Sequence, residues 1–183
     1  RFRVADGKIV RELNEDTLRK DLKVLHAKGE VEALTICFMN AYINGENEIK
    51  AAAIAREIFG DTPISISSEV VPEMQEYERT ETTVVNSYVR PEVSKYIHNL
   101  QAALKERMGD DVLLSMLRSD GGLFSGRTAA DSPVNMLMSG PAVGVTGSIY
   151  FCSRSGFCDF LTFYRCRAST VVALIQHAIS TAR

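Results

Sequence analysis

The residues best suited to chemistry lie near the end of the chain, in a loop between two short apolar strands. The strands are predicted at 160–163 and 171–175, and the loop 164–170 reads Tyr-Arg-Cys-Arg-Ala-Ser-Thr. A tight loop of this kind beside a helix N-terminus can hold a phosphate group, usually through an aspartate and two glycines whose bare N–H groups face the anion. This loop contains no Asp and no Gly, so it lacks the residues that usually bind phosphate in such loops.

A thin helix is predicted directly before these strands. Ser139 and Gly140 precede Pro141, which is tolerated at a first helical position because the N–H there lacks a partner in any case. Small residues dominate positions 142–148, so the helix backbone can approach a neighbour closely. Ser139 and Gly140 are therefore the second candidate element of a phosphate-binding region.

Three motifs occur along the chain in a fixed order. They are Glu-Tyr-Glu-Arg-Thr-Glu-Thr-Thr-Val-Val at 76–85, Arg-Ser-Asp-Gly-Gly-Leu at 118–123 and Met-Ser-Gly-Pro-Ala at 138–142. Together they resemble the hydantoinase A type (N-methylhydantoinase A-like) of the ATP-dependent hydantoinase/5-oxoprolinase family. The resemblance implies an α/β fold built from parts of two actin-like (ribonuclease H-like) ATPase lobes. It also implies a hydrolase that opens a small cyclic amide with ATP and Mg²⁺, and a hydantoinase B-type partner, either a separate protein or a further domain.

The resemblance fails locally, in the loop. In that family the loop reads Asp-Met-Gly-Gly-Thr-Ser-Thr-Asp, whereas here Tyr164 stands for the first Asp, and Cys166 and Arg167 stand for the glycines. Ser169 and Thr170 remain in register. The nucleotide region implied by the resemblance is therefore degenerate, and its residues are Tyr164, Cys166, Arg167, Ser169, Thr170, Ser139 and Gly140. Neither the resemblance nor the sequence identifies catalytic residues, and no metal ligands are predicted.

A glycine turn supplies further candidates. Asp120, Gly121 and Gly122 follow an apolar strand, and ligands of open α/β sheets gather outside the carboxyl ends of strands. The two glycines permit close backbone approach, and Asp120 could orient a polar group. The alternative is an ordinary Asp-Gly turn. The resemblance makes the two interpretations equally acceptable, and we expect the turn to line a cleft near residues 139–144.

Glu76 and Arg79 form the last candidate pair. Acidic residues crowd around Arg79, and on composition alone the segment is a solvated helix start. The family motif favours a position of Glu76 or Arg79 at a cleft between lobes.

The pattern of apolar residues predicts an α/β protein. A strand at 31–39, a helix ending at Gly60 and a strand at 63–67 favour parallel strands joined by a helical crossover, within a mixed sheet. A helix at 84–108 is expected to kink near Pro91, which removes a backbone N–H. We place the end of an N-terminal lobe at 1–72 and the start of a hydantoinase A lobe at 73–183.

The bulk composition excludes several classes of function. The 183 residues carry a net charge of −2, so the charge gives no reason to expect binding to nucleic acid or to an anionic membrane. No apolar run approaches the ~20 residues that span a bilayer. The four cysteines show no zinc-binding spacing, and Cys37 lies in an apolar strand, so we expect reduced thiols and a cytoplasmic protein.

Two functional hypotheses remain open. The chain is either an internal fragment of an ATP-dependent cyclic-amide hydrolase, inactive by itself, or a non-catalytic interaction or regulatory relative that keeps the fold. A misread stretch in an ordinary enzyme gene would also produce the altered loop. Because the chain begins with Arg instead of Met, we expect a fragment whose open edges favour self-association.

Overall fold

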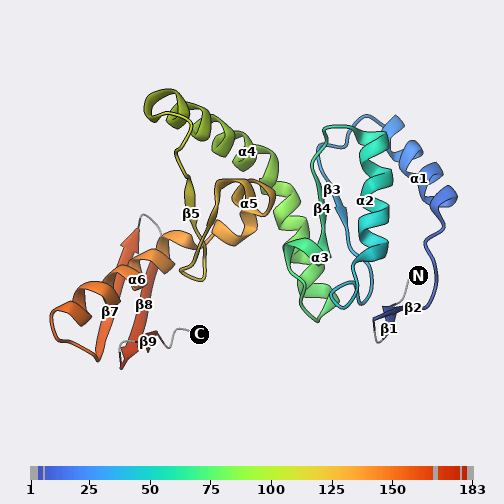
Figure 1. Ribbon diagram of the computed structural model, residues 1–183. Coiled ribbons are helices and arrows are strands. Elements are labelled where there is room, and N and C mark those ends of the chain that lie inside the picture. The colour runs from blue at the N-terminus through green and yellow to red at the C-terminus, as the bar shows by residue number, and fades with distance from the viewer. Residues whose placement is uncertain (1–3, 6, 167–168, 178, 181–183) are drawn as a thin grey trace. The chain divides into compact units, whose positions relative to one another are not determined.

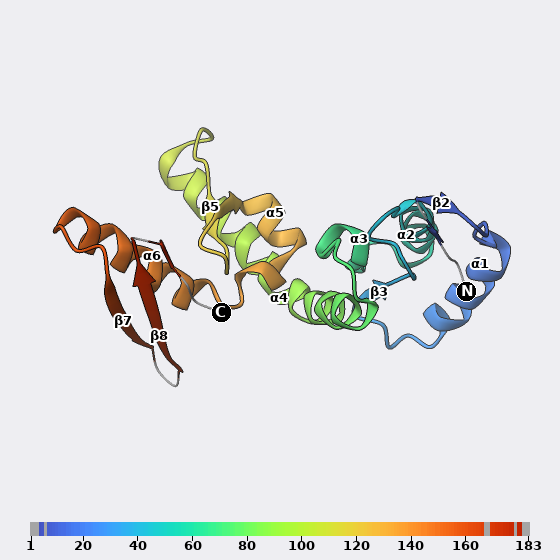
Figure 2. The same cartoon turned by 90° about the horizontal axis from the view of Figure 1, so that it is seen from below.

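The computed structural model of the chain describes residues 4–5, 7–166, 169–177 and 179–180. These residues form two compact units (Figures 1 and 2). Unit 1 comprises residues 1–100 with 130–134, and unit 2 comprises residues 101–129 with 135–183. The lobe boundary expected after residue 72 stays a prediction.

Unit 1 begins with a small hairpin and a helix. Strands β1 (Val4–Ala5) and β2 (Lys8–Ile9) pair antiparallel, and helix α1 spans Glu15–Ala27. The side chain of Asn14 accepts a hydrogen bond from the backbone N–H of Thr17, 3.0 Å away. This bond satisfies one of the free N–H groups at the helix start, which is why Asn14 sets the beginning of α1.

The core of unit 1 is a strand–helix–strand crossover. Strands β3 (Leu34–Ile36) and β4 (Ile64–Ile66) are parallel and are joined by helix α2 (Glu46–Phe59), as the sequence predicts. Both strands are shorter than predicted. The apolar face of α2 packs against them and against α1 in one cluster, which contains Leu13, Leu22, Ala51, Ala52, Ile54, Ala55, Phe59, Ile64 and Ile66.

The long helix α4 (Glu76–Met108) follows the short helix α3 (Ser67–Val70). It begins well before residue 84, the predicted start, and it continues through Pro91. Within unit 1, α4 lies on the side of β3 and β4 that faces away from α2 (Figure 1). Its contacts with the strands are polar: Thr35 bonds Ser87 at 2.6 Å, and Asn86 bonds Ser65 at 3.1 Å.

Unit 2 contains two antiparallel strand groups and a helix of small residues. Strands β5 (Ser115–Leu117) and β6 (Leu123–Ser125) form a hairpin; β6 was not predicted. Helix α5 (Gly126–Asp131) and a short 3-10 helix, η1 (Pro133–Met136), lead to helix α6 (Ser139–Arg154); residues 130–134 of these two helices belong to unit 1. The predicted helix is confirmed, and it starts at Ser139, two residues before Pro141, the predicted first helical position.

The last sheet corrects the prediction of a seven-residue loop. Strand β7 (Phe160–Cys166) pairs antiparallel with β8 (Ser169–Gln176), which pairs with β9 (Ile179–Ser180). Tyr164 pairs with Val171, and Cys166 pairs with Ser169, so most of segment 164–170 is regular strand. The backbone pairing continues because extended strands accept bulky residues more readily than the glycine-rich loops found in phosphate sites.

Candidate functional site

The ring of Tyr164 lies against the backbone of α6. A Cβ atom added at Gly144 would come within 2.6 Å of one ring carbon of Tyr164 and 2.9 Å of another. The missing side chain at Gly144 is therefore what makes room for the ring, as expected for a thin helix. Cys166 and Ser169 are described only by their strand backbone, Thr170 is exposed in β8, and Arg167 lies outside the described residues.

Ser119 connects the glycine turn to the start of α6. Its hydroxyl oxygen accepts a hydrogen bond from the backbone N–H of Met138 at 3.0 Å and donates to the carbonyl of Asn135 at 2.8 Å. Met138 directly precedes Ser139 and Gly140, so the structure brings two of the predicted regions together within unit 2. Sequence reasoning treated Ser119 only as part of the turn expected to line a cleft and did not predict these backbone contacts, although a serine beside an Asp-Gly-Gly turn is a common backbone-binding residue.

The residues of the turn itself have different environments. Gly121 has a φ of +84°, and a Cβ there would meet the hydroxyl of Thr146 in α6 at 3.0 Å. Gly121 also lines an apolar groove of about 310 Å³ with Leu117, Val143, Thr146, Gly147 and Tyr150. Asp120 is exposed instead: its carboxylate accepts the N–H of Gly122 at 2.9 Å and pairs with Arg118 at 3.0 Å. That Asp120 orients a ligand stays a prediction.

Arg79 is fully buried in unit 1, with 1% of its surface exposed. Its guanidinium donates to the carbonyl of Phe38 at 2.8 Å, to the carbonyl of Glu73 at 3.0 Å and to the hydroxyl of Ser67 at 3.1 Å. The cation also lies over the ring of Tyr42, 5.6 Å from its centre. These four contacts are with the chain segments that follow β3 and β4, so Arg79 fixes the carboxyl ends of both strands.

Glu76 lies beside this cluster and is partly exposed. One of its carboxylate oxygens accepts the backbone N–H of Asn40 at 3.1 Å and lies 3.8 Å from Arg79. The Asn40 hydrogen bond is the main cause that lowers the pKa of Glu76, followed by the backbone N–H of Glu76 itself and, more weakly, by Arg79. The carboxylate form is therefore favoured here.

Glu48 is a buried carboxylate that sequence reasoning missed. It is 1% exposed, and its carboxylate accepts hydrogen bonds from the N–H of Phe38 at 2.6 Å, the hydroxyl of Ser67 at 2.7 Å and the N–H of Ser68 at 2.8 Å. A signal was present in the sequence, because Glu48 lies three, four and seven residues before the buried alanines 51, 52 and 55 of α2. Through the Ser67 hydroxyl, the buried carboxylate is linked to the buried cation of Arg79.

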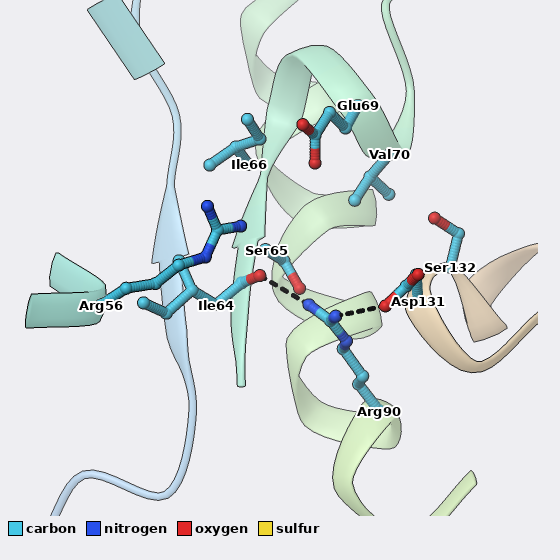
Figure 3. Close-up of a pocket in the computed structure, with 9 residues that line it drawn as sticks. All are labelled: Arg56, Ile64, Ser65, Ile66, Glu69, Val70, Arg90, Asp131 and Ser132. Atoms are coloured by element: carbon cyan, nitrogen blue, oxygen red, sulfur yellow. Dashed lines mark hydrogen bonds and ion pairs between the residues drawn. The ribbon is translucent and has the colours of Figure 1, made fainter. Parts of the chain in front are cut away.

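A polar pocket of about 150 Å³ is lined by all three residues of β4 and by Glu69 and Val70 of α3, and it lies entirely within unit 1 (Figure 3). Arg90 donates to the carbonyl of Ile64 at 2.5 Å and to the carboxylate of Asp131 at 2.6 Å. The guanidinium of Arg56 and the carboxylate of Glu69 also point toward this space (Figure 3). Neither of those two side chains makes an ion pair within the described part of the chain. The pocket therefore offers an unpaired hydrogen-bond donor and an unpaired acceptor.

The described residues provide little for a metal. No group of three or more His, Cys, Asp or Glu side chains among them could hold an ion. In the altered loop, an aromatic ring occupies the position at which the resemblance expects a carboxylate. The residues that the structure describes there do not fit a magnesium–phosphate group. No described helix is both long enough and apolar enough to cross a membrane.

Comparison with known proteins gives two family models that match consecutive parts of the chain. The model described as the Hydantoinase/oxoprolinase N-terminal region matches residues 1–59, and the model described as Hydantoinase/oxoprolinase matches residues 79–177. The second match alone covers more than half of the chain.

Similar proteins have names that fit these models. The chain is 34% identical to 5-oxoprolinase of Saccharomyces cerevisiae over 76% of its own length and 10% of the relative. It is 32% identical to the caprolactamase alpha chain of Pseudomonas jessenii, over 76% of the chain and 20% of the relative. The nucleotide-free structure of acetone carboxylase, an enzyme of ATP-dependent acetone carboxylation, superposes with a TM-score of 0.82 at 27% identity, covering 97% of this chain and 25% of that one.

These similarities confirm the predicted α/β class and the ATPase-type fold of this family. The chain spans between a tenth and a quarter of the length of the proteins that it matches here. Two family models in the expected order, relatives above 30% identity and a close structural match agree with one another. The chain belongs to the hydantoinase/oxoprolinase family.

Proposed function

We propose that the chain is part of an ATP-dependent enzyme that hydrolyses a cyclic amide such as hydantoin, 5-oxoproline or a related lactam. The observation that carries the proposal is the consecutive match of both family models, at 1–59 and 79–177. The relatives named 5-oxoprolinase and caprolactamase support an amide substrate, whereas acetone carboxylase represents a second chemistry. Family members are amide hydrolases or carboxylases, and the amide is the substrate class that we propose.

The cofactors and partners follow from the same proposal. ATP would drive the reaction, because the relatives with solved structures are described as ATP-dependent. A hydantoinase B-type protein is the proposed partner, since the caprolactamase relative is named as one part of a multi-chain enzyme. We propose the cytoplasm as the location because the enzyme would consume ATP. Magnesium would normally be held by one or two carboxylates together with phosphate oxygens.

The altered loop leads us to propose that this chain binds nucleotide weakly and does not catalyse the reaction alone. Tyr164 removes an acidic group, and its ring fills the surface over Gly144. The strand pairing of Cys166 with Ser169 gives an extended backbone instead of a glycine loop wrapped around an anion. A non-catalytic regulatory relative is the alternative function, and Tyr164 is the observation that favours it.

Calorimetric titration with Mg-ATP tests this proposal. In a full-length context, the triple change Tyr164→Asp, Cys166→Gly and Arg167→Gly should restore magnesium-dependent ATP binding, whereas Tyr164→Asp alone should restore little. The 183-residue chain should not bind even with the triple change, because the family's first phosphate loop is not among its residues. Tight binding by the unaltered chain would show that the arginines of the segment replace the glycines.

The polar pocket gives the amide substrate a chemically matched position. A cyclic amide is held in the cis form, so its carbonyl and its N–H point to the same side of the ring. Arg56 can donate to that carbonyl and Glu69 can accept from that N–H, and neither side chain has an ion-pair partner among the described residues. We propose that the pocket of Arg56 and Glu69 binds the amide edge of the substrate.

Nuclear magnetic resonance titration with 2-pyrrolidone tests the pocket separately from nucleotide binding. We expect millimolar binding, with shifts at the backbone amides of residues 64–70. Arg56→Met and Glu69→Gln should each weaken it, whereas Arg11→Met, a change of an exposed arginine outside the pocket, should not. Shifts confined to other residues would contradict the assignment without affecting family membership.

A further inference from the structure

Over its first twenty residues, helix α4 buries polar side chains and exposes several aromatic and apolar ones. The side chains that it buries are polar: Arg79, Thr83, Asn86 and Ser87 are all at most 5% exposed. They bond to the strand region of unit 1 or, for Thr83, to the preceding turn of the helix. A surface helix normally buries its apolar residues and exposes its polar ones. The opposite side of α4 carries aromatic and apolar residues together with charged ones.

That opposite side presents an exposed aromatic face, defined here as Tyr77, Val84, Val85, Tyr88 and Tyr96. Tyr77 is 75% exposed, Tyr88 85% and Tyr96 60%. Val84 lies seven residues after Tyr77 and four before Tyr88, spacings that place all three on one stripe of a helix. At 1.5 Å per residue, the face is roughly 30 Å long. All five residues belong to unit 1.

Acidic residues lie among the residues of the aromatic face. Glu78, Glu81 and Glu92 are exposed on the same side of α4, and none of the three makes an ion pair within the described part of the chain. Lys95 is the one basic residue on that side between positions 77 and 96. A second copy of the chain would bring these acidic residues together, and like charges across an interface are unfavourable. An anionic membrane is disfavoured for the same reason.

We infer that the aromatic face of α4 docks a partner protein through an amphipathic helix whose apolar stripe is bordered by lysine or arginine. Exposed residues spaced seven and four positions apart form a stripe along a helix, and a second helix can pack along such a stripe. Exposed tyrosines supply large contact areas at a low cost in side-chain entropy and are frequent binding hot spots. The basic residues of the partner pair with Glu78, Glu81 and Glu92. The inference is independent of the proposed catalytic reaction.

Two synthetic helical peptides test the inference against the complete 183-residue chain. Both carry the same leucines at heptad positions a and d, and they differ only in having lysine or glutamate at the flanking positions. By fluorescence anisotropy at 50 mM salt, the lysine peptide should bind at least tenfold more tightly than the glutamate peptide. The difference should shrink at 0.5 M salt, because exposed charges are then screened. Tyr88→Ser should weaken binding at least fivefold, whereas Val24→Ser, a change of another exposed apolar residue on α1, should leave binding unchanged.

Charge reversal distinguishes this partner from other occupants. The double change Glu81→Lys and Glu92→Lys should invert the preference, so that the glutamate peptide binds more tightly. Both residues are exposed, so circular dichroism should report an unchanged fold. Equal affinity for the two peptides, no binding below 1 mM peptide, or self-association that Tyr88→Ser abolishes would each overturn the inference.

Discussion

Replacing Gly144 with alanine is the most direct test of the packing between α6 and the altered segment. The added Cβ would lie 2.6, 2.9 and 3.0 Å from three ring carbons of Tyr164. Carbon atoms at ordinary contact are separated by about 3.5–4.0 Å. The ring must therefore retreat by roughly 1 Å, although it is held by the pairing of Tyr164 with Val171 in the sheet.

The magnitude follows from two opposing terms. Overpacking of this kind costs about 1–3 kcal/mol, whereas replacing a glycine in a helix interior with alanine gains up to about 1 kcal/mol. We expect Gly144→Ala to lower the free energy of unfolding by about 1 kcal/mol. In a Tyr164→Ala background the clash is absent, so the same change should raise the free energy of unfolding by about 0.5–1 kcal/mol.

Urea unfolding followed by circular dichroism measures both values. With a typical slope of about 2 kcal/mol per molar urea, a change of 1 kcal/mol moves the midpoint by about 0.5 M. Gly147→Ala is the matched control, because its Cβ would meet nothing within 4 Å in the same helix. If Gly144→Ala stabilises the unaltered chain as Gly147→Ala does, the ring of Tyr164 does not lie on α6.

Three further predictions concern unit 1. Glu48→Gln should lower the free energy of unfolding by about 2–4 kcal/mol, since the new amide group would face donors in a buried site; chemical denaturation measures the loss. Glu76 has a lowered pKa, so its contribution to stability is present above the pKa of the unfolded state and is lost as the pH falls through the folded value. The free energy of unfolding should therefore fall less between pH 7 and pH 4 for Glu76→Gln than for the unaltered chain. The two falls should differ by less than about 1 kcal/mol, because the position is partly exposed, and unfolding curves at both pH values measure them. Arg90→Met and Asp131→Asn should be non-additive by about 0.5–1.5 kcal/mol in a double-mutant cycle, because the two side chains bond directly and Arg90 also holds Ile64; additive effects would show that the pair contributes nothing.

Local signals in the sequence are sufficient to predict several elements. The acceptor side chain of Asn14 and the spacing of apolar residues after it predict α1, and the apolar segments on either side of α2 predict the parallel crossover. The proline after Ser139 and Gly140 predicts the start of α6. Each of these features depends on residues within a few positions of one another, which is the range over which propensity and capping act.

Local signals in the sequence do not predict the polar interior of unit 1. Arg79 and Glu48 are far apart in the sequence and meet only because Ser67, after β4, lies between them. Such a network is specified by tertiary contacts, and a charged residue in a helix is expected to be exposed until its partners are known. For the same reason, the start of α4 has the composition of a solvated acidic segment, although the helix buries polar side chains and exposes tyrosines.

The altered segment fits the packing around it, and this fit is compatible with either origin of the segment. The ladder from Phe160 paired with Ile175 to Cys166 paired with Ser169 has no interruption in register. Tyr164 fits because Gly144 already lacks a side chain, so the tyrosine needs no compensating change elsewhere in α6. The segment can thus keep this packing both in a natural regulatory relative and after a compensated reading error. Sequencing the parent gene through codons 164–168 decides between them: an Asp-Met-Gly-Gly-Thr reading would restore the catalytic hypothesis, and a confirmed Tyr-Arg-Cys-Arg-Ala reading would favour the regulatory one.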